Sequence, residues 1–93
     1  MKLNICLNPS IERVEVDNEI VLLDKKTQTI CVANETMRSI VDYLVKDSTN
    51  IIQLKEYFFS LYHNTSSNIL NKDFDNALQL LTSNNIVEYV IQE

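Results

Sequence analysis

The 93-residue chain contains no glycine and no tryptophan, and it has only one proline and one histidine. Without glycine it cannot form the glycine-rich loops that cradle phosphates in dinucleotide-binding and P-loop proteins. Asparagine and aspartate are the next residues to tolerate positive φ at tight turns. They stand together as Asp17 and Asn18, and again as Asn84 and Asn85, so we expect a turn at each place.

Groups that bind metals or attack substrates are equally scarce. His63 is the only histidine, and Cys6 and Cys31 lie too far apart for a CxxC motif. One histidine with two scattered cysteines has no zinc spacing, and neither cysteine has a base near it in the sequence. We therefore expect no enzymatic activity, no cofactor, no metal, and cysteines that remain reduced thiols.

Basic residues are too few for a typical nucleic-acid-binding protein. Eight basic against thirteen acidic residues give a net charge of −5, whereas binding to nucleic acid requires the neutralisation of phosphates. The sequence also lacks a run of about eighteen apolar residues and a signal segment within residues 1–10. We therefore expect neither nucleic acid nor membrane as a partner, and a cytoplasmic location.

The remaining composition is typical of one small globular domain. Apolar residues make up 45% of the chain, an ordinary fraction for a folded protein. A chain of this length buries roughly two thirds of its unfolded surface, which allows one modest core but no deep substrate cavity as well. No linker, repeat or low-complexity segment interrupts the sequence, so we expect a single domain over residues 1–93.

The N-terminal third alternates with the period of a β-strand. Leu3, Ile5 and Leu7 alternate with less apolar residues until Pro9, so residues 1–10 form either a strand or an extended arm. Three further strands are predicted at residues 13–16, 19–23 and 29–32, the first two joined by a two-residue turn. The middle strand is apolar on both faces, as in a strand covered on both sides, and the N-terminal arm is one candidate cover.

Three helices are predicted after the strands. Asn34 is the N-cap candidate of the first, with Glu35 in its first turn. The second runs from about residue 51 to 62 behind capping candidates at 48–50, and the third from Ser66 or Ser67 to about residue 83, before an extended segment at 86–91. Their apolar stripes are Met37, Ile40, Val41, Leu44 and Val45; Ile51, Leu54, Phe58, Leu61 and Tyr62; and Leu70, Phe74, Ala77, Leu78 and Leu81.

The third predicted helix carries a second stripe, which we call the flank stripe. At about 100° per residue, Ile69, Asp73, Asn76 and Leu80 lie immediately beside the core stripe. Two apolar residues bracket two polar ones on this face. The flank stripe is either the edge of a wide buried face or one wall of a groove.

In order and spacing, these segments resemble the PqqD-like family, the peptide-recognition domains of ribosomal peptide maturation. In that family an apolar run ends in Leu-Leu-Asp and is followed by a polar turn, a short strand and an Asn at the start of the first helix. Later an Asp is followed by an apolar residue, and the last helix ends at Gly followed by Leu or Ile. Asn85 stands where the family usually has Gly, and residues 27–29 lack the usual Gly of the turn. The resemblance covers residues 13–89, and the matching residues are Leu22, Leu23, Asp24, Asn34, Ile40, Leu44, Asp73, Phe74, Leu78, Leu81 and Ile86.

The resemblance implies an α+β fold, a truncated winged helix-turn-helix in which a three-stranded antiparallel sheet is followed by three helices. It also implies a non-catalytic protein that binds the leader of a ribosomally made precursor peptide, which adds as a strand to residues 29–32 and leans on the third helix. The implied partners are a leader peptidase and a macrocycle-forming enzyme of lasso-peptide biosynthesis, or a radical-SAM peptide-modifying enzyme. The Leu-Leu-Asp run favours the lasso type.

Physical chemistry adds a requirement to this implied site. Backbone pairing along a strand edge does not depend on sequence, and ordering a disordered leader costs about 2–5 kcal/mol, so apolar contacts are also needed. Asp73 is suited to a basic leader residue and Lys72 to an acidic one. The expected peptide-binding residues are Thr29, Ile30, Cys31, Val32, Ile69, Lys72, Asp73, Asn76 and Leu80.

A DNA-binding winged-helix regulator is the alternative function from another class of protein. Its recognition helix should carry Arg or Lys, but residues 68–83 contain Lys72 as their one basic residue beside two aspartates. Outside the implied site, we expect Asp24 to form the turn through its side chain, and Arg13 and Arg38 to be solvated. The oligomeric state is expected to be a monomer or a weak dimer formed through the N-terminal arm.

Overall fold

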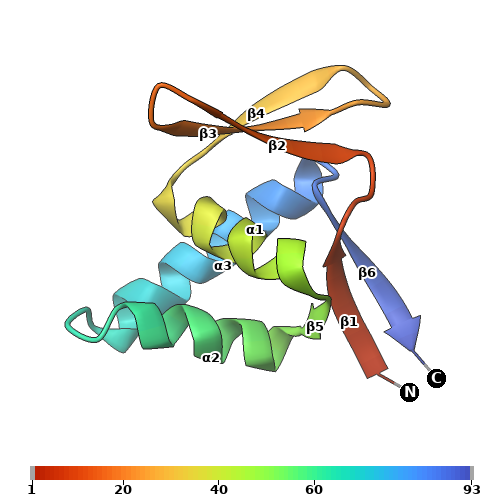
Figure 1. Ribbon diagram of the computed structural model, residues 1–93. Helices are drawn as coiled ribbons and strands as arrows, with labels where there is room; N and C mark the ends of the chain where they lie inside the picture. The colour runs from red at the N-terminus through yellow and green to blue at the C-terminus, as the bar shows by residue number, and fades with distance from the viewer. Residues whose placement is uncertain (1, 93) are drawn as a thin grey trace.

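The computed structural model describes residues 2–92. Over this range the chain forms strands, then helices, and returns to a strand that lies beside the first one (Figure 1). The elements are β1 (Lys2–Leu7), β2 (Ile11–Val16), β3 (Glu19–Asp24), β4 (Thr29–Ala33), α1 (Glu35–Lys46), β5 (Thr49–Asn50), α2 (Ile51–Leu61), α3 (Ser67–Ser83) and β6 (Val87–Gln92).

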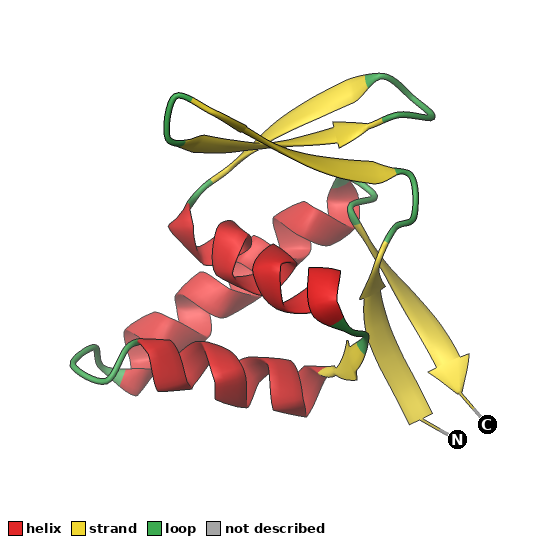
Figure 2. Cartoon of the chain, in the orientation of Figure 1, coloured by secondary structure: helices red, strands yellow, loops and turns green. Residues whose placement is uncertain are grey.

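The strands form two separate antiparallel sheets (Figure 2). One is the meander β2-β3-β4, which lies across α1 and α3 at the top of the view. The other has the order β5-β1-β6, with β1 paired along its whole length with β6. The predicted α+β fold, with a three-stranded antiparallel sheet followed by three helices, is confirmed, and the predicted segments at both ends join in a second sheet.

Residues other than glycine make the tight turns with positive φ. Asp17 and Asn18 have φ of 50° and 68° and form the two-residue hairpin turn predicted between β2 and β3. Asn85, with φ of 59°, makes the left-handed turn after α3, whereas Asn84, with φ of −93°, caps the helix. Gln28, with φ of 64°, takes the same conformation between β3 and β4, where the sequence did not predict it.

Each helix begins behind a predicted capping side chain. The Oδ1 atoms of Asn34 and Asn50 accept hydrogen bonds from the amide three residues further on, at 2.9 and 2.8 Å respectively. Ser66 Oγ accepts the corresponding bond at 3.4 Å. The first amides of a helix have no partner within it, so these caps determine where α1, α2 and α3 start.

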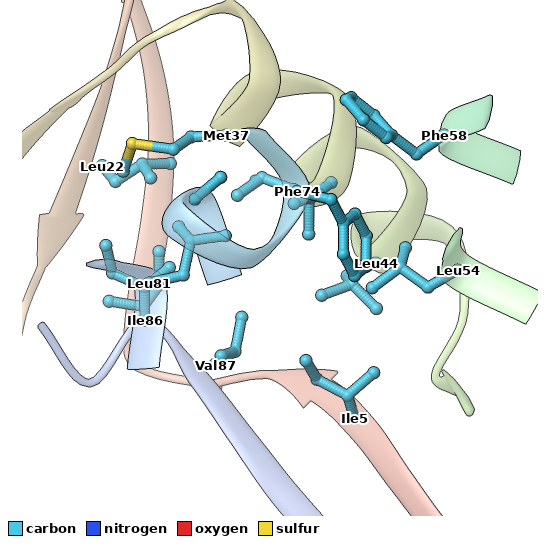
Figure 3. Close-up of a cluster of buried hydrophobic side chains, with 14 of the residues drawn as sticks. Ile5, Leu22, Met37, Leu44, Leu54, Phe58, Phe74, Leu81, Ile86 and Val87 are labelled. Atoms are coloured by element: carbon cyan, nitrogen blue, oxygen red, sulfur yellow. The ribbon is translucent and has the colours of Figure 1, made fainter. Parts of the chain in front are cut away.

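The core lies where the helices meet the two sheets (Figure 3). Phe74 of α3 stands 5.6 Å, centroid to centroid, from Phe58 of α2. Val45 and Leu61 were predicted in the core but are 56% and 44% exposed, because each lies in the final turn of its helix at the margin of the apolar stripe. The buried apolar residues are Ile5, Ile11, Ile20, Leu22, Met37, Ile40, Val41, Leu44, Leu54, Phe58, Leu70, Phe74, Ala77, Leu81, Ile86 and Val87.

The N-terminal strand does not cover β3, so the role considered for it is wrong. β1 pairs with β5 and β6 in the second sheet, where Ile5 is fully buried and Leu7 packs against the core. β3 buries Ile20 and Leu22 against the helices. Its other face, with Val21 and Leu23, is half-buried.

β2 turns a charged side chain toward the helices and an apolar side chain away from them. Ile11 and Arg13 point toward the helices, and Arg13 Nε lies 2.7 Å from Asp42 Oδ1 of α1. Alternation then places Val14 on the outer face, opposite Val21 of β3. Arg38 Nε also lies 3.7 Å from Asp42 Oδ2. Both arginines thus have an acidic partner, while their side chains stay 29% and 43% exposed to solvent.

Candidate functional site

β4 is an edge strand. Its register places Cys31 opposite Leu22 and Ala33 opposite Ile20 of β3, and no strand within residues 2–92 pairs with its other side. Such an edge presents backbone N–H and C=O groups to which a further strand can add. The edge predicted at residues 29–32 is present, and its strand extends to Ala33.

The side chains of β4 alternate between the two faces of the sheet. Cys31 and Ala33 pack against the core, and burial raises the pKa of the Cys31 thiol. Ile30 and Val32 point the other way and are 68% and 57% exposed. Thr29 is exposed at the start of the strand. A segment added to this edge would therefore continue two faces, one toward the helices and one toward solvent.

The flank stripe of α3 is exposed. Ile69 and Leu80 are 54% and 47% exposed, and Asp73 and Asn76 are exposed as well. The core face of α3 is formed instead by Leu70, Phe74, Ala77 and Leu81. The flank stripe therefore lies outside the buried face of α3 and is open to solvent.

Two hollows mark the region between α3 and the chain in and just after β4, which we call the gap. A small one of about 20 Å³ joins Thr29, Ile30 and Cys31 to Asn84 and Ile86, beyond the end of α3. A larger one of about 220 Å³ joins Asp73 to the first residues of α1, which directly follow β4. The start of β4 thus lies near the end of α3, and the end of β4 leads toward Asp73, so the two elements run in opposite directions.

The α1 end of this gap is acidic. The larger hollow is lined by Glu35 and Asp73, together with Tyr62 from the end of α2. The Tyr62 hydroxyl donates to Glu35 Oε1 at 3.4 Å and lies 3.2 Å from Ser39 Oγ. Two carboxylates with no basic residue among the lining side chains favour a cationic group in this hollow.

The two hollows are lined by four of the nine predicted peptide-binding residues, and Val32, Ile69, Asn76 and Leu80 line neither hollow. Thr29, Ile30 and Cys31 line one hollow and Asp73 lines the other. Lys72 is exposed and lines neither hollow. It comes one residue before Asp73, and consecutive residues of a helix point about 100° apart.

Three residues near this gap were not predicted as site residues. Glu35 and Tyr62 line one hollow and Asn84 the other. The sequence indicated Glu35 and Asn84 only as residues at helix ends, and Tyr62 only as a core residue. The residues next to them in the sequence do not reveal which distant side chains they contact.

Within residues 2–92 no group of three or more His, Cys, Asp or Glu side chains is placed to hold a metal ion. Cys6 and Cys31 are free thiols. Burial, and then the nearby carboxylate of Glu88, raise the pKa of Cys6, so both thiols are held protonated and weakly nucleophilic. None of the described helices is long and apolar enough to cross a membrane.

Neither a protein-family model nor a curated protein sequence matches this chain. Two solved structures resemble it over nearly its whole length. TbiB1 in complex with the TbiA(beta) leader peptide superposes with a TM-score of 0.73 at 16% identity, covering 94% of this chain and 99% of that one. Lasso peptide synthetase B1 complexed with its leader peptide gives 0.70 at 20% identity, covering 90% and 96%. The fold is therefore that of these two proteins.

Proposed function

We propose that this protein binds the leader segment of a ribosomally made precursor peptide and presents the attached peptide to maturation enzymes. The leader adds as a strand to the free edge of β4 and packs against the flank stripe of α3. The protein itself is non-catalytic and acts in the cytoplasm, where such precursors are made. The observation that carries the proposal is the edge of β4, which no strand within residues 2–92 pairs with, in a fold shared with two leader-bound proteins. The exposed side chains of Ile69 and Leu80 on α3 support it.

The side chains at the gap match what leader binding requires. Strand addition supplies backbone hydrogen bonds of no sequence preference, while Ile69 and Leu80 offer apolar surface that a leader side chain can bury. Asp73 and Glu35 favour a basic leader residue near the α1 end. Affinity therefore comes from the apolar contacts, and orientation of the leader from the acidic end.

The lasso-peptide type is favoured over a partner of a radical-SAM enzyme. The Leu22-Leu23-Asp24 run resembles the lasso members of the PqqD-like family, and one of the two structures of like fold is lasso peptide synthetase B1. On this proposal the partners are a leader peptidase and a macrocycle-forming enzyme. Co-purification with each of these, and with a radical-SAM enzyme, tests the choice.

Fluorescence polarisation with labelled leader peptides tests the binding itself. Leu80→Asp should weaken binding about tenfold to a hundredfold, because burial of a leucine side chain contributes about 1.5–3 kcal/mol. Leu61→Asp is the matched control, since Leu61 is equally exposed, at 44% against 47%, but lies on α2. Cys31→Pro tests the strand edge, with circular dichroism as the check of folding.

Equal affinities of wild type and Leu80→Asp, in a folded protein, would contradict the proposed site. No binding of any leader peptide by the wild type would contradict the proposed function. Retention of binding by Leu61→Asp is required for the effect at Leu80 to be assigned to the flank stripe.

A further inference from the structure

Within residues 2–92 the two sheets have four edge strands, and the chain protects only some of them against pairing. β2 and β4 are the edges of one sheet, and β5 and β6 are the edges of the other. β2 has the sequence IERVEV, in which charged residues alternate with apolar ones, and β5 has only two residues. Charge and shortness both discourage the addition of a further strand. β4 receives the leader in the proposed function, which leaves β6 to be explained.

The edge of β6 carries neither kind of protection. Its sequence, VEYVIQ, consists mainly of β-branched and aromatic residues and contains no proline or lysine. Within residues 2–92 only β1 pairs with it, and its other side lies at the margin of the molecule (Figure 1). Tyr89, Val90 and Ile91 are 41%, 44% and 61% exposed. A long apolar edge of this kind is a template for a further strand.

The hydrogen bonds to β1 determine which backbone groups of β6 remain available. The amide of Asn8 donates to Ile86 O at 2.8 Å, in the same register as the pairs between β1 and β6. In an antiparallel ladder, every second residue directs its N–H and C=O groups to the same neighbouring strand. Glu88 and Val90 therefore direct these groups to β1. The residues whose backbone groups point to the free side are Val87, Tyr89 and Ile91.

A hollow lies beside this free edge. Tyr89 stands opposite the buried Ile5 of β1, and its hydroxyl lies 3.3 Å from Thr82 Oγ1 of α3. The hollow, of about 370 Å³, is lined by Tyr89 and by residues of α3 that include Leu78 and Thr82. Since no residue of β1 or α1 lines it, the hollow lies toward the free side of β6. A strand added to this edge would place side chains next to it.

We propose that the free edge of β6 pairs with β6 of a second copy of this chain, antiparallel and about a two-fold axis, and joins the two β5-β1-β6 sheets into one. The two-fold axis requires one residue of β6 to lie opposite its own copy. Hydrogen bonding requires that residue to have backbone groups on the free side. Tyr89 is the central residue that meets both conditions. In this register Val87 lies opposite Ile91 of the other copy.

A second copy fits this edge because β6 is complementary to itself in that register. On the side of the helices, a tyrosine pair lies at the centre with a valine–isoleucine pair on each side of it. On the opposite side, Glu88 lies opposite Val90 of the other copy, so no like charges are directly opposed. Aromatic and β-branched pairs across antiparallel strands stabilise a sheet. The edge of β4 belongs to the other sheet and stays open in both copies.

The size of the contact predicts a reversible dimer. Five paired residues form an edge roughly 17 Å long and about 10 Å thick, or about 170 Å², whereas a stable interface covers about 800 Å² on each partner. The net charge of −5 on each copy also opposes association. We therefore expect monomer and dimer to exchange, with the dimer favoured as the protein concentration rises.

Ile91→Pro tests the backbone pairing. Because the amide of Ile91 points to the free side, proline there removes no hydrogen bond to β1 but removes two across the two-fold axis. The dissociation constant of the dimer should rise about tenfold or more, since a carbonyl group of each copy loses its donor. Ile91→Val keeps the amide and is the matched control. Sedimentation velocity from micromolar to millimolar concentration measures the dimer, and circular dichroism checks the fold.

Crosslinking through an introduced cysteine tests the register. Tyr89→Cys places two thiols opposite each other, on Cα atoms about 5.5 Å apart, which is within the range of a disulfide. Val90→Cys is the matched control, because its two thiols are diagonal neighbours on Cα atoms about 7–8 Å apart, beyond that range. Both variants retain Cys6 and Cys31. The wild type under the same oxidation therefore measures any link that these two thiols form.

We expect the wild type and Ile91→Val to dimerise as concentration rises, and Tyr89→Cys alone to form a covalent dimer on oxidation. A wild type that stays monomeric at millimolar concentration would overturn the proposal. A folded Ile91→Pro variant that dimerises like the wild type would overturn it too, as would crosslinking of Val90→Cys in place of Tyr89→Cys. Leader binding is measured separately, so each of these results leaves the proposed function standing.

Discussion

Arg13 Nε of β2 lies 2.7 Å from Asp42 Oδ1 of α1, so an ion pair joins the three-stranded sheet to the helix that follows it. The same carboxylate is 3.7 Å from Arg38 Nε, one turn earlier on α1. The contact therefore ties the sheet whose free edge is β4 to the helix that directly follows that strand.

Asp42→Asn should lower the free energy of unfolding by about 0.5–1 kcal/mol, since the two side chains of the closer pair are 29% and 38% exposed and solvent screens them. Urea unfolding of this variant, of Arg13→Gln and of the double variant measures the coupling between the two residues. Arg38→Gln serves as the comparison, with a smaller effect because its distance is longer. A coupling of zero between Arg13 and Asp42 would show that the contact does not stabilise the fold.

Asp24 makes the stability of the protein sensitive to acid. Its pKa is held below the ordinary value chiefly because Ser10 Oγ donates to Oδ1 at 2.8 Å; burial opposes this, and the amides of Lys26 and Thr27 support it. A carboxyl with a lowered folded-state pKa contributes stability above its unfolded-state pKa and loses it as pH falls through the folded-state value. The loss therefore falls below about pH 4.

Ser10→Ala removes the largest cause of this shift. The variant should lose less stability than the wild type between about pH 5 and pH 2, measured by urea unfolding at each pH, and Asp24→Asn should lose less still. Identical pH profiles for wild type and Asp24→Asn would assign the acid sensitivity to other carboxylates.

Asn85 holds a left-handed conformation, with φ of 59°, between α3 and β6. Asn85→Val should cost about 1–2 kcal/mol, because a β-branched residue is strained there, whereas Asn85→Gly should be tolerated. Thermal or urea unfolding distinguishes them. Asn84→Val is the neighbouring control, since Asn84 has φ of −93° and loses only its capping bond to Leu80 O. Equal losses from the two valine substitutions would contradict the role of backbone conformation.

Local chemistry made much of this fold predictable. Asn34 and Ser66 each have a side chain suited to an N-cap and precede an amphipathic stripe, so the starts of α1 and α3 could be predicted before any contact was known. Asp17 and Asn18 predicted the β2–β3 hairpin turn for a similar reason, because they tolerate positive φ. The positive φ of Gln28 could not be predicted, since glutamine carries no such preference.

Neighbouring residues alone were therefore enough to predict the helices, the caps, most turns, and the flank stripe with two alternatives for its role. The tertiary structure alone decided which faces meet. It paired β1 with β6, whose partner residues lie 80 to 90 positions apart in the chain, turned Arg13 inward and Val14 outward, and left Leu80 exposed on α3. The physical reason is that period and propensity act within a few residues, whereas sheet pairing and burial follow from contacts between segments that no local pattern records.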